Sequence, residues 1–239
     1  MKDKIVLIVG GSGGIGSATA KKFAKEGSKV VLAARNKSKA EEVAKHINDN
    51  GGEAFAIEVE ATNPSSVETM AQEIEDNLGK IDILINAFGQ GLIQPFMDIN
   101  PKDAKEVINV NVFGTFLVTQ TVMKHMNTED STNVVFFPGT MGKYVMKNAS
   151  VYAASKFAIQ GFVKSLIEEQ RRGKTKYSLL YLGGVDTPFW DDERVDMRVK
   201  KEMMLTPSEV AESVYHAVNQ PSGSVMNEMV IQPESHQLV

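Results

Sequence analysis

The 239-residue sequence contains no cysteine, four histidines and one tryptophan. Without thiols the chain can form no disulfide bond, no thiolate nucleophile and no cysteine-based zinc site. The histidines are far apart in the sequence and make no metal-ligand motif, so we expect no metal site; they are His46, His125, His216 and His236.

Apolar runs of membrane-spanning length are also missing, and Met1–Lys4 leads into the first apolar stretch with no signal-like segment. We therefore expect a cytoplasmic protein without a membrane partner. The net charge of −4 gives no electrostatic reason to expect nucleic acid as a partner. The sequence shows no repeat, low-complexity tract or linker, and we expect a single domain over residues 1–239.

A glycine-rich stretch follows the first apolar run and organises the chain. Ile5–Val9 is apolar throughout, as in a strand buried on both faces, and residues 17–24 are typical of a helix. A turn between strand and helix presents free N–H groups and the positive end of the helix dipole to a phosphate. This position favours a dinucleotide site over an ordinary glycine-rich turn. The expected cofactor contacts here are Gly10, Ser12, Gly13, Gly14, Ile15 and Gly16.

Strand-like and helix-like segments alternate along the rest of the chain. Strands are expected at 5–9, 29–34, 54–59, 81–85, 133–137, just before 183, and at 228–231. Helices are expected at 17–24, 39–50, 64–78, from 101 onward, at 152–172 and at 207–219. Such alternation implies right-handed βαβ crossovers. We predict an α/β fold with a doubly wound, parallel seven-stranded sheet and helices on both faces, which is a Rossmann-like architecture.

The end of the second predicted strand indicates which dinucleotide binds. An acidic residue at this point would bind a ribose 2′-hydroxyl, whereas an arginine accommodates a 2′-phosphate. The chain has Ala34 followed by Arg35 and Asn36, and a guanidinium can pair with a phosphate. We predict NADP(H) as the cofactor; a solvated surface arginine is the alternative.

Tyr152 and Lys156 lie on one face of a predicted helix, because residues four apart are neighbours there. A nearby ammonium favours the phenolate, so we expect Lys156 to lower the pKa of Tyr152. Such a tyrosine can exchange a proton with a carbonyl or an alcohol. The pair is weak evidence alone, but it follows the fifth strand of a predicted nucleotide fold. Asn111 lies in an apolar helical stretch and needs a hydrogen-bond partner, in either a structural or a functional role.

With these motifs the chain resembles the short-chain dehydrogenases/reductases, in their single-domain branch, from Lys4 to Gln232. Gly10-x-x-x-Gly14-x-Gly16 matches the cofactor turn of that family, Asn111 its active-site asparagine, and Tyr152 with Lys156 its catalytic pair. The resemblance implies that Asn111 holds a water in a proton relay and that Lys156 also binds the nicotinamide ribose. It implies further cofactor contacts at Glu60, Ala61, Asn86, Ala87, Phe88, Tyr152, Gly183, Val185 and Thr187.

The chain departs from the family at the catalytic serine. Counted back from Tyr152, that position holds Gly139, and Gly142 follows in the family's register. Thr140 is the nearest hydroxyl and could substitute for the serine, but it would need a one-residue slip to point inward. We expect Gly139→Ser to restore a hydrogen bond to the substrate, unless the glycine has a positive φ.

The substrate side is expected on three loops beyond the sheet. Their apolar residues suggest a pocket for an apolar carbonyl compound, or ordinary loop packing; they are Leu92, Ile93, Phe96, Met141, Tyr144, Val145, Met146, Phe189 and Trp190. We expect a mobile lid at about residues 188–204. The resemblance also implies a homodimer or homotetramer built partly on the helices that carry Asn111 and Tyr152.

Two functions remain open. The first is an NADPH-dependent oxidoreductase that reduces an apolar ketone or aldehyde, or runs the reverse alcohol oxidation, with Tyr152 as proton donor. The second is an NADP(H)-binding protein with weak or lost catalysis that acts as a binding or regulatory module. Asn111, Tyr152 and Lys156 favour the enzyme, and Gly139 favours the module.

Overall fold

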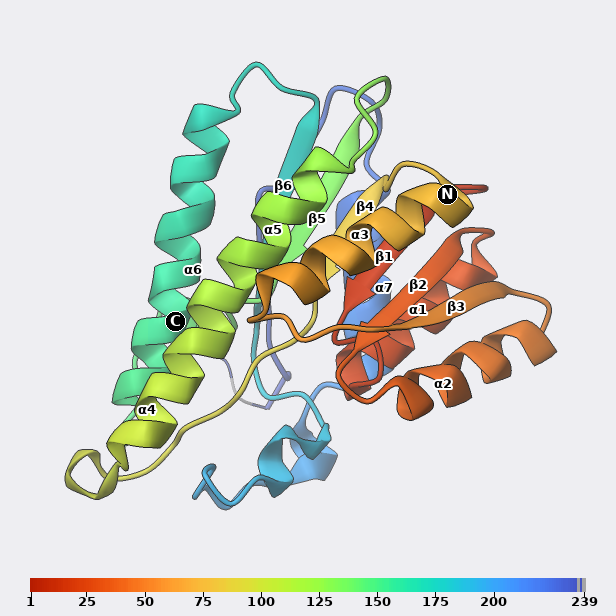
Figure 1. Ribbon diagram of the computed structural model, residues 1–239. Coiled ribbons are helices and arrows are strands. Elements are labelled where there is room, and N and C mark those ends of the chain that lie inside the picture. Colours follow the sequence, from red (N-terminus) through yellow and green to blue (C-terminus); the bar gives the residue numbers. More distant parts are fainter. Residues whose placement is uncertain (236, 238–239) are drawn as a thin grey trace.

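Seven parallel strands form one sheet in the order β3-β2-β1-β4-β5-β6-β7 (Figure 1). The computed structural model describes residues 1–235 and residue 237. The predicted doubly wound, Rossmann-like α/β fold is confirmed. The strands are β1 (Ile5–Val9), β2 (Lys29–Ala34), β3 (Glu53–Glu58), β4 (Ile83–Asn86), β5 (Thr132–Phe136), β6 (Thr175–Leu182) and β7 (Glu228–Ile231).

Helices cover both faces of the sheet. Successive strand residues point to opposite faces, so the strands contribute to two apolar cores, one on each side. Helices α3, α5 and α6 pack on one core and α1, α2 and α7 on the other. The helices are α1 (Gly14–Lys25), α2 (Lys37–Asp49), α3 (Pro64–Leu78), α4 (Pro101–Ile108), α5 (Thr115–Lys124), α6 (Ser150–Glu169) and α7 (Pro207–Val218).

The helix starts follow local sequence signals. Asn63 precedes Pro64 and its side chain accepts a hydrogen bond from Ser66 N at 3.0 Å, which caps α3. Thr206 and Glu209 form a capping box before α7. The predicted long helix from residue 101 is α4 and α5 joined through one wider π turn, η2 (Asn109–Gly114). That turn contains Asn111, and such turns are frequent at functional sites.

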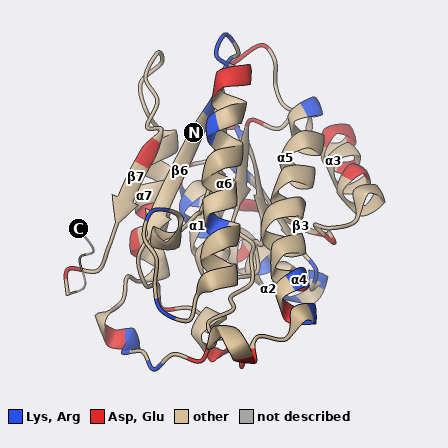
Figure 2. Ribbon diagram, turned by 90° about the vertical axis from the view of Figure 1, so that its left-hand side faces the viewer, with Lys and Arg blue, Asp and Glu red and all other residues tan. Residues whose placement is uncertain are grey.

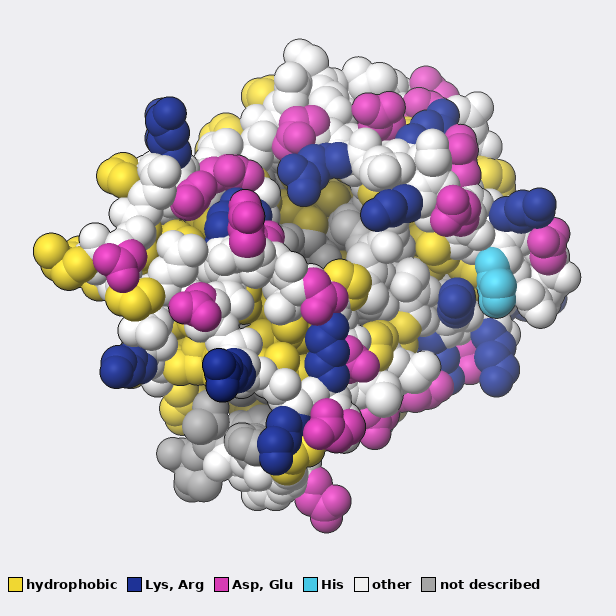
Figure 3. Space-filling model, turned by 90° about the horizontal axis from the view of Figure 1, so that it is seen from below, with side chains coloured by type: hydrophobic (Ala, Val, Ile, Leu, Met, Phe, Trp, Pro, Cys, Tyr) yellow, Lys and Arg dark blue, Asp and Glu magenta, His cyan; other side chains and the backbone are white. Residues whose placement is uncertain are grey.

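The chain reverses its winding direction between β1 and β4. From β1 it runs outward to β2 and β3, and from β4 outward to β7. Ala87 N donates to Val9 O at 2.8 Å just beyond these two strands. In such sheets the ligand crevice lies outside the carboxyl ends of the strands at this reversal. Figure 3 views this end of the molecule, which is hollowed near its centre.

No helix in the described part of the chain is long and apolar enough to cross a membrane. Among the same residues, no three histidine or carboxylate side chains are grouped so as to hold a metal ion. His236 lies outside the described residues. The cytoplasmic location stays a prediction.

Candidate active site

The turn after β1 is shaped to receive a phosphate. Gly10 has a φ of +88°, and a Cβ there would lie 2.6 Å from the Ala87 carbonyl oxygen, so only glycine fits. Gly13 precedes α1, whose first turn has no side-chain cap and no acidic residue. The N–H groups of that turn therefore remain available to an anion. These features fit the pyrophosphate of a dinucleotide.

Asn86 gives a second sign of a ligand at this end of the sheet. It ends β4, next to Val9 of β1, and is almost fully buried. Its amide nitrogen and oxygen have no hydrogen-bond partner among the described residues. Buried polar groups are nearly always paired, so the unpaired amide fits a site that a bound group completes.

Arg35 lies at the carboxyl end of β2 with its side chain exposed, and no ion pair holds it within the described part of the chain. Asn36 accepts a hydrogen bond from Lys39 N at 3.1 Å and caps α2, which gives it a structural role. Glu60 is exposed, and its Oε1 accepts from Thr62 N and Oγ1 at 3.2 and 2.8 Å. The expected contact between Glu60 and the cofactor stays a prediction.

The loop after β6 lies beside the glycine turn. A Cβ at Gly14 would be 2.7 Å from Thr187 Cγ2, so the two segments meet closely. Val185 is buried, and its carbonyl oxygen accepts hydrogen bonds from Trp190 Nε1 at 2.8 Å and from Thr187 Oγ1 at 3.4 Å. The loop with the expected cofactor contacts Val185 and Thr187 is therefore at the same end of the sheet as the expected phosphate turn.

Phe88 contributes to this region through its backbone. A Cβ at Gly10 would lie 2.8 Å from Phe88 N, whereas the Phe88 ring packs toward Gly114 and the core beneath α3 and α5. Ala61, another expected contact, is buried. The bulky side chain at position 88 is thus accommodated away from the glycine turn.

Asn111 is buried and clamps the loop after β4. Its Oδ1 accepts from Gln90 N at 2.8 Å, and its Nδ2 donates to Gln90 O at 2.9 Å and to Ser155 Oγ at 3.0 Å. The backbone oxygen of Asn111 accepts from Thr115 Oγ1 at 2.7 Å. The required partners of Asn111 are therefore protein groups, and its relay water stays a prediction.

Tyr152 and Lys156 lie together on α6, as predicted. Lys156 Nζ is 5.6 Å from the centre of the Tyr152 ring and donates to Phe137 O at 3.0 Å. Burial lowers the pKa of Lys156 to about 8. Burial also raises the pKa of Tyr152 above its ordinary value. The expected lowering of the Tyr152 pKa by Lys156 is therefore not found in the chain by itself, where burial disfavours the phenolate and shifts the pKa upward.

Gly139 has a φ of +63° and a ψ of 172°, a combination that is essentially restricted to glycine. A Cβ there would make only ordinary van der Waals contacts, with Leu182 O nearest at 3.6 Å, but the backbone would be strained. Because Gly139 has a positive φ, Gly139→Ser is not expected to restore the hydrogen bond to the substrate without strain. Thr140 follows in a buried position, and its hydroxyl has no hydrogen-bond partner among the residues that the structure describes.

Two residues of the site were not predicted from the sequence. Gln90 and Ser155 both bind the Asn111 side chain, and Ser155 also donates to Tyr152 O at 2.7 Å. Ser155 had a signal, since it lies three positions after Tyr152 on the same helix face. Gln90 acts through its backbone, which no residue type reveals.

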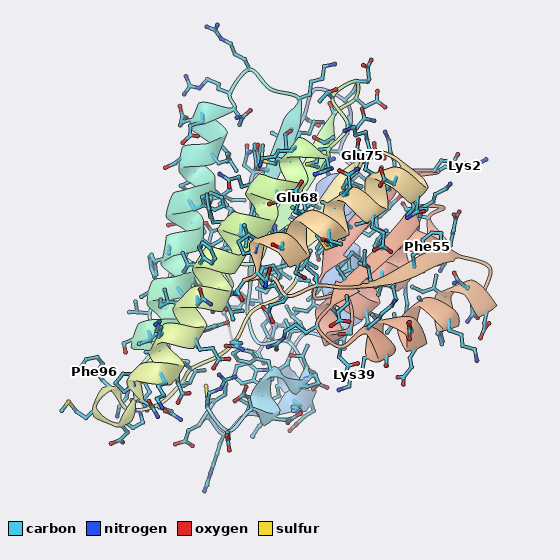
Figure 4. All side chains as sticks on the ribbon, viewed as in Figure 1. Lys2, Lys39, Phe55, Glu68, Glu75 and Phe96 are labelled. Atoms are coloured by element: carbon cyan, nitrogen blue, oxygen red, sulfur yellow. The ribbon has the colours of Figure 1, made fainter. Side chains whose placement is uncertain are left out.

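Apolar side chains gather above Tyr152, but they are not all those expected. Ile93, Ala149 and Val195 are buried together, with Met141, Met146, Phe189 and Trp190 packed against them. Phe96 and Val145 are 70% and 80% exposed, and Phe96 projects outward from the loop before α4 (Figure 4). These two residues therefore do not line a pocket over Tyr152.

Segment 188–204, the expected lid, is docked on the loop after β4. Ile93 N donates to Arg194 O at 2.8 Å and Asp196 N donates to Ile93 O at 2.9 Å. Arg194 also pairs with Asp192 at 2.8 Å. The segment thus covers this end of the site, and its mobility stays a prediction.

A parallel sheet with a phosphate-binding turn at its reversal point is the arrangement of a dinucleotide-binding fold. Here an asparagine, a tyrosine and a lysine lie at the same end of the sheet. The sequence profile of the short chain dehydrogenase family matches residues 4–198. An uncharacterized oxidoreductase of Staphylococcus epidermidis is 32% identical over 233 residues, 98% of each chain. The chain therefore belongs to the short chain dehydrogenase family and is an oxidoreductase of that type.

Solved structures of this class superpose over nearly the whole chain. An alcohol dehydrogenase from the archaeon Thermococcus sibiricus, complexed with 5-hydroxy-NADP, has a TM-score of 0.90 at 21% identity and covers 100% of both chains. A short chain dehydrogenase/reductase from Burkholderia phymatum, in complex with NAD, has a TM-score of 0.86 at 21% identity and covers 96% of this chain and 89% of its own. At this identity the likeness shows the fold.

Proposed function

We propose that this protein is an NADPH-dependent reductase of apolar ketones or aldehydes, or catalyses the reverse alcohol oxidation. The observation that carries the proposal is the buried Lys156 beside Tyr152, at the end of the sheet where Asn111 clamps the loop after β4. A proton donor and a cation at one apolar site suit the reduction of a carbonyl group.

The cofactor is proposed to be NADP(H). Both NADP and NAD occur among the structural neighbours, so the choice depends on this chain's own residues. Arg35 is exposed and Ala34 precedes it, so a 2′-phosphate would meet a guanidinium and no carboxylate. The turn at Gly10–Gly16 would hold the pyrophosphate, and Val185 and Thr187 the nicotinamide end.

Bound NADPH supplies a hydride to the carbonyl carbon. Tyr152 gives its proton to the carbonyl oxygen, and the Lys156 ammonium stabilises the phenolate that remains. In the reverse direction Tyr152 takes the alcohol proton. Gly139 has no hydroxyl to donate to the developing oxyanion, and Thr140, buried next to it, is the residue proposed to substitute for the serine if its hydroxyl points inward.

The second candidate is an NADP(H)-binding module with weak catalysis, and Gly139 is the observation in its favour. Steady-state oxidation of NADPH at 340 nm with a panel of apolar ketones and aldehydes separates the two. Turnover that saturates with substrate supports the reductase, while tight NADPH binding without turnover supports the module.

A homodimer or homotetramer is proposed through the outer face of α5 and α6. Phe113, Phe116 and Phe157 are 42%, 38% and 39% exposed on this face, and Figure 2 shows few charged residues on α5. Apolar side chains gathered at a surface mark an interface. Sedimentation of the intact protein tests this proposal, and a monomer at micromolar concentration would contradict it.

A further inference from the structure

Phe189 lies directly against the proposed proton donor. Its ring centre is 5.6 Å from that of Tyr152, with the ring planes tilted by 43°. This separation is within the range that aromatic pairs prefer, which is about 4.5–7 Å. Phe189 belongs to η4 (Pro188–Asp191), immediately after the loop that ends at Thr187. The Phe189 ring therefore lies over Tyr152 where a substrate would have to approach.

Gly91 provides the room for this ring. A Cβ at Gly91 would lie 2.6 Å from Phe189 Cε2 and Cζ, and 2.7 Å from Val195 Cγ2. Such distances are too short for real carbon contacts, so a side chain at position 91 would force the ring to move. Glycine at position 91 thus leaves the room that the Phe189 ring occupies.

The segment that carries Phe189 is held closed from both ends. Trp190 Nε1 donates to Val185 O at 2.8 Å next to the ring. Farther along, Val195 is buried against Ile93. Arg194 lies 3.6 Å from Glu106, which in turn accepts from Gln90 Nε2 at 2.7 Å. The Phe189 ring is therefore part of an apolar cover over Tyr152 that these contacts hold in place in the structure.

We propose that Phe189 is the specificity-determining residue of the site and selects planar apolar carbonyl compounds, such as aryl aldehydes. This inference rests on the proposed function. In the structure, the space between Tyr152 and Gly91 holds the flat ring of Phe189. When Phe189 moves aside, an aryl group next to the carbonyl can take the place of its ring, in the same tilted contact with Tyr152. A puckered ring of similar size is thicker, so the space between Tyr152 and Gly91 excludes it.

The test compares benzaldehyde with cyclohexanecarbaldehyde, which share ring size and differ in planarity. NADP⁺ is used in place of NADPH, so that no hydride is available and binding alone is measured. Trp190, the one tryptophan of the chain, lies with its ring centre 5.0 Å from that of Phe189 and reports binding by its fluorescence. The native protein is expected to bind benzaldehyde about tenfold more tightly, and Phe189→Ala to bring the two dissociation constants within about threefold.

Gly91→Ala supplies an independent second arm. It should displace the Phe189 ring and so reduce the preference of the native protein for benzaldehyde over cyclohexanecarbaldehyde. In Phe189→Ala, the same substitution should change the ratio of the two dissociation constants little. The same preference in the native protein and in Phe189→Ala overturns the proposal, as does the absence of binding of either aldehyde to the native protein. A lack of NADPH oxidation by every variant would refute the proposed function instead, and the binding ratios would still decide the role of Phe189.

Discussion

Lys156 Nζ lies 5.6 Å from the centre of the Tyr152 ring and donates its hydrogen bond to the Phe137 carbonyl oxygen. No carboxylate among the described residues pairs with this ammonium, and burial lowers its pKa to about 8. A buried cation without an acidic partner destabilises a fold. Its presence beside the half-buried Tyr152 is understandable if it serves chemistry at this site.

The first prediction concerns Lys156 and pH. The pKa of about 8 lies below the ordinary 10.5, so between these values the unfolded chain binds more protons than the native one. The free energy of unfolding must therefore rise with pH through that range. Between pH 7 and pH 10, the free energy of unfolding of the native protein should rise by about 2 kcal/mol relative to that of Lys156→Met, which lacks the charge.

Urea unfolding of both proteins at several pH values measures this difference. Lys156→Met also removes the hydrogen bond to Phe137 O, so the change of the stability difference with pH is compared and not its size at one pH. If the difference in the free energy of unfolding between the native protein and Lys156→Met stays constant from pH 7 to pH 10, the pKa of Lys156 is not lowered.

Much of the fold could be predicted because its signals are local. Ile5–Val9 and, after Lys29, Val30–Ala34 are apolar runs buried on both faces, and the predicted bounds 5–9 and 29–34 match the strands. Pro64 and Pro207 begin their helices as predicted, since capping depends on neighbouring residues. The pairing of Tyr152 with Lys156 followed from helix geometry alone.

The remaining features depend on contacts between distant segments. The φ of Gly139 is fixed where the end of β5 meets β6, and the residue type only permits it. The place of Phe189 requires Gly91, far away in the sequence, to lie beneath it. The pKa of Tyr152 depends on how deeply the surrounding loops bury it, so its neighbour Lys156 could be predicted from the sequence but the direction of its pKa shift could not.

The second prediction concerns the cofactor. Arg35→Ala should weaken NADPH binding about tenfold or more, because a hydrogen bond to a charged group contributes about 1.5–3 kcal/mol. NADH binding should hardly change, since NADH lacks the 2′-phosphate. Isothermal titration with both cofactors measures this. Equal losses for NADPH and NADH would place Arg35 outside the phosphate site.

The third prediction separates Thr140 from Gly139. Thr140→Val keeps the shape and removes the hydroxyl, and it should lower kcat/KM by about tenfold to a hundredfold if that hydroxyl binds the developing oxyanion. The dissociation constant for NADPH should stay unchanged. A variant with native kcat/KM would assign the oxyanion contact to Tyr152 alone.

The fourth prediction concerns Gly139 itself. Gly139→Ser should lower stability by about 1–3 kcal/mol, because the backbone at φ +63° and ψ 172° suits glycine. Gly139→Ala is the matched control, since it adds the strain without the hydroxyl. Thermal unfolding and kcat/KM of both variants test this. A serine variant that is as stable as the native protein and clearly faster would mean that the backbone adapts and the family's hydroxyl can be restored.

The central claim is that Tyr152 is the proton donor of a carbonyl reductase. Tyr152→Phe keeps the ring against Phe189 and removes only the hydroxyl. The decisive measurement is kcat/KM for NADPH-dependent reduction of an apolar aldehyde by this variant, with NADPH binding followed in parallel through Trp190 fluorescence. We predict a loss of about a hundredfold or more in kcat/KM with the NADPH dissociation constant unchanged. Turnover at the native rate by Tyr152→Phe would contradict the account.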